Sequence, residues 1–259
     1  MRDTLNIALV QAQIAWQDPE ENRQHLQSLM AGVSDATDLV VLPETFTTGF
    51  LGENPSQSED MQGPTVAWLQ QQAAKLQSVI TGSVAIFENG LFHNRLLWVQ
   101  PGGQINYYDK RHLFARAGET ERYQPGTERR TWDWNGWRVC PQICYDLRFP
   151  VWSRNRGDYD LLLYVANWPA PRVDAWSTLL KARAMENQSY VIGVNRVGED
   201  GNNKIYPGAS VVLDPLGRAV VEAGQGETVV YARIEANTLH TIREQFPFQA
   251  EADPFRFTP

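Results

Sequence analysis

The stretch VCPQICYD at residues 139–146 decides the fold, because it is a short apolar run that ends abruptly in a polar turn. Such a run predicts a buried strand, and Cys144, at its end, then lies at the rim of a sheet, where a nucleophile can be presented. The only other cysteine, Cys140, lies four residues earlier. In an extended strand that separation is ~13 Å, well beyond the ~7 Å limit for a disulfide, so both thiols are expected to be unpaired.

Two further reactive side chains occupy equivalent places in the sequence. Glu44 ends the apolar run 39–43, and Lys110 follows the strand-like run 105–108. A carboxylate, an ammonium and a thiol, each at the end of a strand, can converge on one pocket. These three groups are the equipment for thiol-mediated acyl transfer.

Strand and helix patterns are mixed along the whole chain with no linker between them, which predicts a single α/β domain over residues 1–259. The expected helices span 18–30, 64–76 and 175–188, and the expected loops span 52–63, 113–126 and 198–202. The expected strands span 7–13, 38–42, 79–87, 95–99, 105–108, a hairpin over 132–138, then 139–143, 160–166, 190–195, 209–213, 219–222 and 228–234. A tail starts at about residue 236; its aromatic, non-periodic part, 246–257, either lies across a neighbouring subunit or folds back on its own chain.

The composition is that of an ordinary globular protein, with 42% hydrophobic and 20% charged residues. A net charge of −7 argues against a nucleic-acid partner, which would require a basic surface. No apolar stretch approaches the ~20 residues of a membrane span, and the first residues lack the pattern of a signal peptide. With two unpaired thiols, these observations predict a protein of the reducing cytosol.

The chemistry of the three side chains is complementary. A free thiol has a pKa of ~8.5 and is mostly protonated at neutral pH. Glu44 can take its proton during attack, while Lys110 and the backbone N–H of Tyr145 are candidates for an oxyanion hole. Each residue alone has a plainer interpretation, as a core cysteine, a loop carboxylate or a solvated lysine. The occurrence of all three at strand ends favours catalysis.

Cysteine–histidine catalysis is the competing interpretation. Of the four histidines, His112 alone follows a strand end of interest, and the sequence offers no evident Asn or Asp to orient it. The histidines are scattered without metal-binding spacing, and no Gly-rich phosphate loop follows a strand. The sequence therefore predicts neither a metal nor a cofactor.

Several segments resemble the nitrilase superfamily of carbon–nitrogen hydrolases and look closest to its bacterial omega-amidase branch. The matching segments are LPETF at 42–46, YDKRHLF at 108–114, ICYDLRFP at 143–150, NWP at 167–169 and KARAMENQ at 181–188. The resemblance implies an α-β-β-α sandwich of two mixed sheets flanked by helices, a homodimer and no cofactor. It also implies that Glu44 is the general base, Lys110 the oxyanion stabiliser and Cys144 the nucleophile.

The same resemblance implies a second glutamate between the lysine and the cysteine. Glu119 fits that position best, although Glu121 is two residues away. Omega-amidases act on the side-chain amides of 2-oxoglutaramate, 2-oxosuccinamate and related monoamides of dicarboxylic acids, whose remaining carboxylate needs a cation. Arg172 is the expected cation, with a solvated loop arginine as its plainer interpretation. Arg148 is the alternative, but its neighbours suggest a structural ion pair.

Phe46, Tyr145 and Trp168 are the expected walls of the substrate pocket, although each is equally compatible with a place in the core. The resemblance leaves other activities open. An N-carbamoyl amino acid amidohydrolase or a nitrilase acting on cyano groups would use the same three residues. A catalytically idle binding protein is the alternative from a different class, and it would have no chemical need for all three.

Overall fold

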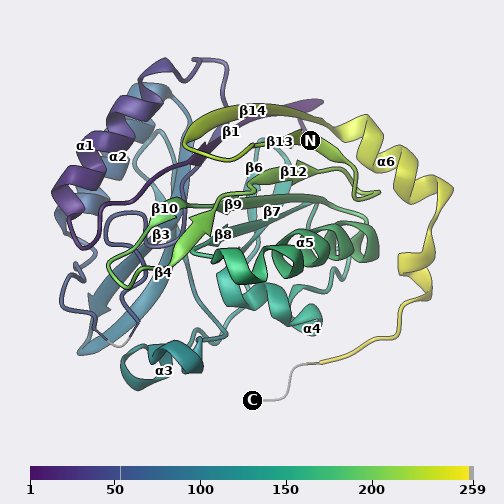
Figure 1. Cartoon of the computed structure of the whole chain (residues 1–259). Coiled ribbons are helices and arrows are strands. Elements are labelled where there is room, and N and C mark those ends of the chain that lie inside the picture. The colour runs from purple at the N-terminus through teal and green to yellow at the C-terminus, as the bar shows by residue number, and fades with distance from the viewer. Residues whose placement is uncertain (53, 257–259) are drawn as a thin grey trace.

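The computed structural model describes residues 1–52 and 54–256 and contains two six-stranded sheets that pack face to face between helices (Figure 1). Glu53, in the expected loop 52–63, and Phe257, in the expected aromatic tail, lie outside the described residues. This α-β-β-α sandwich confirms the fold that the resemblance implies. No helix within the described residues is long and apolar enough to cross a membrane.

The first sheet has the strand order β14-β1-β2-β3-β4-β5. Its strands are β1 (Thr4–Gln11), β2 (Leu39–Val41), β3 (Val79–Glu88), β4 (Leu91–Val99), β5 (Ile105–Asp109) and β14 (Thr228–Glu235). The strands β1, β2 and β3 are parallel, and the remaining pairs are antiparallel. Because β5 is antiparallel to β4, and β4 to β3, the carboxyl ends of β2 and β5 reach the same edge of the sheet.

The second sheet has the strand order β13-β12-β9-β8-β7-β6, with β7, β8 and β9 parallel. Its strands are β6 (Trp132–Trp134), β7 (Trp137–Ile143), β8 (Leu161–Ala166), β9 (Tyr190–Asn195), β12 (Val211–Leu213) and β13 (Ala219–Glu222). The expected turn at 198–202 joins a separate hairpin of β10 (Val197–Glu199) and β11 (Ile205–Pro207).

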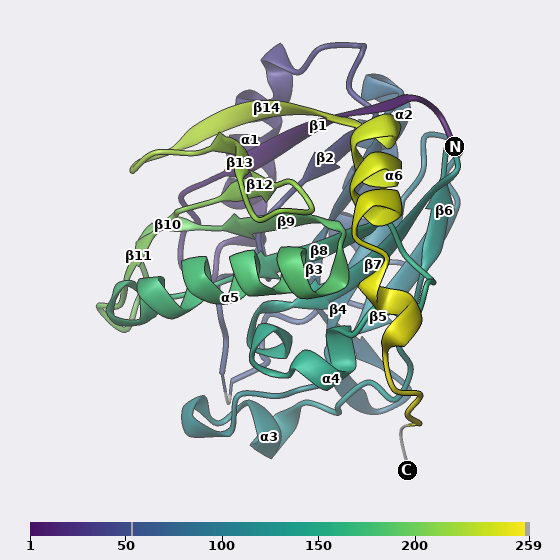
Figure 2. The same cartoon turned by 90° about the vertical axis from the view of Figure 1, so that its right-hand side faces the viewer.

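The described residues form six α-helices, three of which cover the outer faces of the sheets. The six are α1 (Pro19–Leu29), α2 (Pro64–Leu76), α3 (Glu119–Arg122), α4 (Pro150–Ser153), α5 (Val173–Asn187) and α6 (Ala236–Gln245). The helices α1 and α2 pack on the outer face of the first sheet, and α5 packs on the outer face of the second (Figure 2). As the sequence predicts, α1 begins at Asp18, whose side chain accepts a hydrogen bond from the Glu21 N–H, with Pro19 at the first helical position.

The alternation of side chains along each strand separates the core into layers. Ile7 and Leu9 point toward the second sheet and meet Ile143 and Val165 there, whereas Val10 points outward to the helices. All of these side chains are fully buried. Each parallel strand thus buries side chains on both faces of its sheet. For this reason these strands are continuous apolar runs with few polar residues except at their carboxyl ends.

The region after residue 235 differs from the expected tail. It begins with α6, whose Ala236, Leu239 and Ile242 are buried and recur every three residues. Ala236 and Leu239 belong to the core between the two sheets, so this helix folds back on its own chain. The aromatic residues beyond it dominate the sequence pattern there, which is why the helical period was missed.

Gly82, in β3, allows the segment that follows β2 and carries Glu44 to pack closely on the sheet. A Cβ atom at Gly82 would lie 2.8 Å from both Leu42 Cβ and Phe46 Cδ1. We expect Gly82→Ala to lower the free energy of unfolding by about 1–3 kcal/mol, because an added methyl group overpacks this contact. Urea denaturation monitored by tryptophan fluorescence measures the change.

The matched control is Gly102→Ala, in the turn between β4 and β5, where no heavy atom lies within 4 Å of the added Cβ. We expect that substitution to change the free energy of unfolding by less than about 0.5 kcal/mol. Equal effects of the two substitutions would show that the close approach at Gly82 is not a packing constraint.

Candidate functional site

The three reactive residues expected from the sequence meet at one edge of the sandwich. Glu44 follows β2, Lys110 follows β5, and Cys144 follows β7 as the first residue of the 3-10 helix η3 (Cys144–Arg148). The Lys110 Nζ atom lies 2.9 Å from Glu44 Oε1. The thiol of Cys144 lies close enough to Glu44 and Lys110 for the charges of both to act on its pKa. Strands of both sheets therefore bring their terminal residues together.

Lys110 is held between two glutamates. Besides Glu44, it donates to both carboxylate oxygens of Glu119, at 3.0 and 2.9 Å. All three side chains are at most 1% exposed. Glu119 opens α3 and also accepts the Phe114 N–H at 2.7 Å, whereas Glu121 is exposed. Of the two candidates for the second glutamate, the geometry places Glu119 beside the lysine.

These contacts keep the ammonium charged. Burial lowers the pKa of Lys110, but the charges of Glu119 and Glu44 outweigh it and hold the pKa well above its usual value. Burial raises the pKa of Glu119, against the opposing charge of Lys110. Lys110 therefore provides a fixed positive charge at neutral pH next to the Cys144 thiol.

Cys144 is a protonated thiol with a base beside it. Burial and then the Glu44 charge raise the pKa of this thiol well above its usual value, although Lys110 acts in the opposite direction. The thiol consequently needs a proton acceptor when it reacts, and Glu44 is the carboxylate whose charge acts on it most strongly. Cys140 is also unpaired, but it is fully buried among the apolar residues beneath α5.

Two asparagines that the sequence analysis did not identify as site residues fix the Glu44 carboxylate. Asn94, in β4, donates to Glu44 Oε1 at 2.8 Å and to Glu119 Oε1 at 3.2 Å. The backbone N–H of Asn167, just after β8, donates to Glu44 Oε2 at 2.7 Å, and its side chain donates to the Glu44 carbonyl oxygen at 2.9 Å. The sequence offered no clear signal for Asn94, because it stands between His93 and Arg95 in the polar part of β4.

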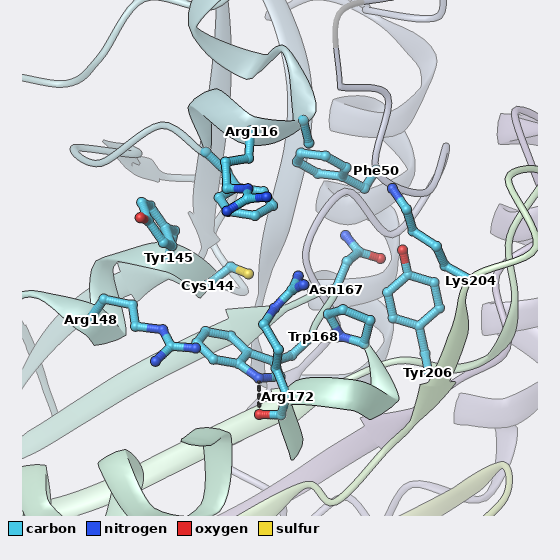
Figure 3. A pocket seen from close by; sticks show the side chains of 13 residues that line it. Phe50, Arg116, Cys144, Tyr145, Arg148, Asn167, Trp168, Arg172, Lys204 and Tyr206 are labelled. Atoms are coloured by element: carbon cyan, nitrogen blue, oxygen red, sulfur yellow. Dashed lines mark hydrogen bonds between the residues drawn. The ribbon is translucent and has the colours of Figure 1, made fainter. Parts of the chain in front are cut away.

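A cavity of about 460 Å³ opens onto the Cys144 sulfur (Figure 3). Aromatic rings and cations form most of its wall, and no Asp or Glu is among the described residues that line it. The lining residues are Phe50, Phe114, Arg116, Ala117, Cys144, Tyr145, Arg148, Asn167, Trp168, Pro169, Arg172, Lys204 and Tyr206. The local charge is thus opposite in sign to the net charge of the chain, −7.

Of the three expected wall residues, Tyr145 and Trp168 line the cavity and Phe46 does not. Phe46 is fully buried in the core beneath α2, with its ring centroid 6.0 Å from that of Trp68. The interpretation of Phe46 as a pocket wall is therefore wrong, and Phe50, four residues later, takes that place. Both follow β2 as aromatic residues, so the sequence pattern does not separate them.

Arg172 and Arg148 both line the cavity, but they do so differently. The Arg172 side chain points into it (Figure 3), and its carbonyl oxygen accepts the Trp168 indole N–H at 2.6 Å. The Arg148 guanidinium lies 4.9 Å above the Trp168 ring. Among the described residues Arg148 makes no ion pair within 4.0 Å, so the expected structural ion pair is wrong. The sequence analysis missed Arg116, which lies in the 3-10 helix Ala115–Ala117, and Lys204, which lies in the turn between β10 and β11.

His112 has a carboxylate partner that the sequence did not reveal. Its Nδ1 lies 2.8 Å from Asp146 Oδ1, and its ring stacks on Phe149 with a centroid separation of 3.7 Å. His112 is not among the residues that line the cavity, and the carboxylate that acts most strongly on the thiol is Glu44. The arrangement therefore favours Glu44, rather than His112, as the proton acceptor for Cys144.

Among the described residues, no three His, Cys, Asp or Glu side chains are placed to share a metal ion. The site contains a nucleophilic thiol (Cys144), a neighbouring carboxylate (Glu44), a fixed ammonium (Lys110) and a cavity lined by cations. Such a set can attack a carbonyl carbon, accept and return a proton, and stabilise an oxyanion.

Known proteins share both the sequence and the fold. The chain is 47% identical over 253 residues to an omega-amidase YafV of Yersinia enterocolitica, covering 97% of this chain and 98% of the relative. It is 34% identical over 246 residues to a 2-oxoglutaramate amidase of Bacillus subtilis, covering 93% and 95%. A crystal structure of a CN-hydrolase superfamily protein from Xanthomonas campestris, with an arsenic adduct in its active site, matches with a TM-score of 0.97 at 49% identity over 100% of both chains.

The family model for carbon–nitrogen hydrolases matches residues 6–244, which include all strands except the first two residues of β1, and nearly all of α6. The matched residues contain Glu44, Lys110, Glu119 and Cys144, the four whose side chains meet beneath the cavity. The chain is a member of the carbon–nitrogen hydrolase family, the nitrilase superfamily.

Proposed function

We propose that this protein is an omega-amidase, which hydrolyses the side-chain amide of short dicarboxylate monoamides such as 2-oxoglutaramate and 2-oxosuccinamate. The observation that carries the proposal is the meeting of Glu44, Lys110 and Cys144 beneath a cavity with a cationic wall. The similarity to an omega-amidase and to a 2-oxoglutaramate amidase supports the same substrates.

In the first half-reaction, Cys144 Sγ attacks the amide carbon while Glu44 takes the thiol proton. The negative charge that develops on the carbonyl oxygen is stabilised by Lys110 and by the Tyr145 N–H. That N–H lies in the first turn of η3, where backbone N–H groups have no intrahelical acceptor. The C–N bond then breaks, Glu44 returns its proton to the leaving nitrogen, and ammonia departs from a thioester on Cys144.

In the second half-reaction, Glu44 activates a water molecule that attacks the thioester carbon. The same oxyanion donors act again, the C–S bond breaks, and the proton on Glu44 returns to the sulfur. One amide and one water thus give one carboxylic acid and one ammonia, and the enzyme is regenerated. Glu119 assists by holding Lys110 in place through two hydrogen bonds.

Arg172 is the proposed partner of the substrate's remaining carboxylate. Its guanidinium points into the cavity, and an arginine can bind a carboxylate through two parallel hydrogen bonds. Tyr145 and Trp168 line the same cavity, where their rings offer apolar surface to the substrate. A monoamide that spans the two groups would place its amide carbon at the sulfur.

We further propose that the chain acts as a single catalytic domain, as a homodimer and in the cytosol, without a metal or cofactor. The two unpaired thiols support a reducing compartment. The homodimer rests on the family resemblance alone.

The substrate assignment is tested by ammonia release from five compounds, namely 2-oxoglutaramate, succinamate, glutamine, an N-carbamoyl amino acid and a simple nitrile. We expect the first two to be turned over with the highest kcat/KM, because each joins a terminal amide to a free carboxylate. Glutamine does so too, but it also carries an ammonium that the cationic wall of the cavity repels. Turnover of the carbamoyl compound or the nitrile alone would replace this assignment by one of the other family activities.

Replacement of the nucleophile tests the chemical route. We expect Cys144→Ala to lower kcat by a factor of about 10⁴ or more, because the thioester can no longer form. Mass spectrometry of the wild-type protein quenched during turnover is expected to find the acyl group on Cys144. The control Cys140→Ala retains turnover, and an adduct on Cys140 would contradict the route.

The carboxylate-binding role is tested by Arg172→Gln, which keeps the carbonyl oxygen bonded to Trp168. We expect KM for 2-oxoglutaramate to rise about 10- to 100-fold, because a charge-assisted hydrogen bond contributes about 1.5–3 kcal/mol. An uncharged amide of similar length should show no such rise. Arg148→Gln is expected to change KM less, and the reverse ranking would assign the carboxylate to Arg148.

A further inference from the structure

Residues that flank Lys110 and the residue before Cys144 all donate hydrogen bonds to one buried carboxylate, that of Asp146. We propose that Asp146 is a positioning residue for this reaction, one that fixes the turn carrying Cys144 against the strand end carrying Lys110. The inference rests on the proposed function, and it assigns a role to a side chain that touches neither the substrate nor the reacting atoms.

Both oxygens of Asp146 are fully engaged. Oδ1 accepts the backbone N–H of His112 at 2.9 Å and its ring Nδ1–H at 2.8 Å. Oδ2 accepts the Tyr108 hydroxyl at 2.8 Å and the Ile143 backbone N–H at 3.0 Å. The residue is 0% exposed. A buried carboxylate with four donors is satisfied and therefore rigid.

These four bonds tie together the segments that carry the two reactive groups. Tyr108 and His112 lie two residues before and two residues after Lys110, and Ile143 directly precedes Cys144. The first segment belongs to one sheet of the sandwich and the second to the other. Asp146 consequently sets the position of the ammonium relative to the thiol across the interface between the sheets.

The turn at Cys144 needs such support. Cys144 has a φ of 44°, in the left-handed region, which costs a residue with a side chain about 1–2 kcal/mol. The bond from the Ile143 N–H to Asp146 spans this residue and closes the turn around it. Strained backbone of this kind persists only when its surroundings hold it.

The partners of Asp146 are themselves held in place. The Tyr108 hydroxyl accepts the Trp152 indole N–H at 3.0 Å, and the His112 ring stacks on Phe149. Burial and then the charge of Asp146 raise the pKa of Tyr108 well above its usual value, so its hydroxyl stays protonated and donates. The carboxylate thus sits among donors that cannot easily turn away.

Asp146→Asn breaks this arrangement with almost no change in volume. Whichever way the new amide is turned, its NH₂ group faces either His112 or the Tyr108 and Ile143 pair. Each side includes a backbone N–H, which cannot rotate away, so one backbone donor loses its acceptor. The strand end or the turn must then shift, and a displacement of about 1 Å at a reacting group can lower a rate about 100-fold.

The experiment compares Asp146→Asn with Asp160→Asn. Asp160 is 1% exposed and accepts from Arg138 and Arg243, but it precedes β8 at the end remote from the cavity. Three quantities are measured for each variant: the melting temperature, kcat and KM for 2-oxoglutaramate, and the pH at which alkylation of Cys144 by iodoacetamide is half-maximal. Tyr108→Phe, which removes one donor, is a milder second variant.

We expect Asp146→Asn to lower kcat about 10- to 100-fold with KM changed by less than about threefold, and Tyr108→Phe to lower it less. The alkylation midpoint should move to lower pH in Asp146→Asn, because a loosened turn lets the thiol leave Glu44 and the buried site that raise its pKa. Asp160→Asn should lower the melting temperature and leave both readouts unchanged.

The proposal is overturned if folded Asp146→Asn has the kcat and the alkylation midpoint of the wild-type protein. In that case its only change would be a lower melting temperature, as in the control Asp160→Asn. Alkylation does not depend on turnover. If the wild-type protein released no ammonia from any monoamide, the proposed function would fail, and the alkylation midpoints would still decide whether Asp146 positions the thiol.

Discussion

Lys110 is buried between Glu44 and Glu119, and an ammonium in that place is tolerable because both carboxylates lie within 3.0 Å of it. Removing one partner from such a buried group typically costs about 3–5 kcal/mol, since the remaining charge is left uncompensated. The same arrangement decides the state of the nucleophile. Two carboxylates and burial hold the nearby thiol protonated, so its reactivity depends on a base positioned beside it rather than on a permanent thiolate.

The site lies where the two sheets meet, and polar contacts join the sheets there. Glu44, at the end of a first-sheet strand, is bound by Asn167, at the end of a second-sheet strand. Tyr108 reaches across in the same way to Asp146. The apolar core sets the spacing of the sheets but is not directional, whereas these hydrogen bonds are, and they fix where the terminal residues lie.

Much of this arrangement could be predicted from the sequence, for a definable reason. Glu44, Lys110 and Cys144 follow strands whose carboxyl ends lie at one edge of the sandwich, so these residues meet there whatever the intervening loops do. Arg116 lies in the short 3-10 helix Ala115–Ala117, and Lys204 and Tyr206 belong to the β10–β11 hairpin. These residues reach the cavity only through tertiary packing. Phe46 and Phe50 follow the same strand, and only the contact with Trp68 decides which of them enters the core. The helix α6 was missed because it is short and precedes an aromatic segment.

The positive wall of the cavity has a consequence for the departing molecule. Hydrolysis of a monoamide that carries one carboxylate yields an acid with a second negative charge, while the four lining cations, Arg116, Arg148, Arg172 and Lys204, remain unchanged. Coulomb attraction in a partly enclosed space is therefore stronger for the product than for the reactant. The positive wall that attracts the anionic substrate therefore also delays the exit of the diacid product. Dissolved salt screens both attractions, so it would speed product release and slow substrate binding.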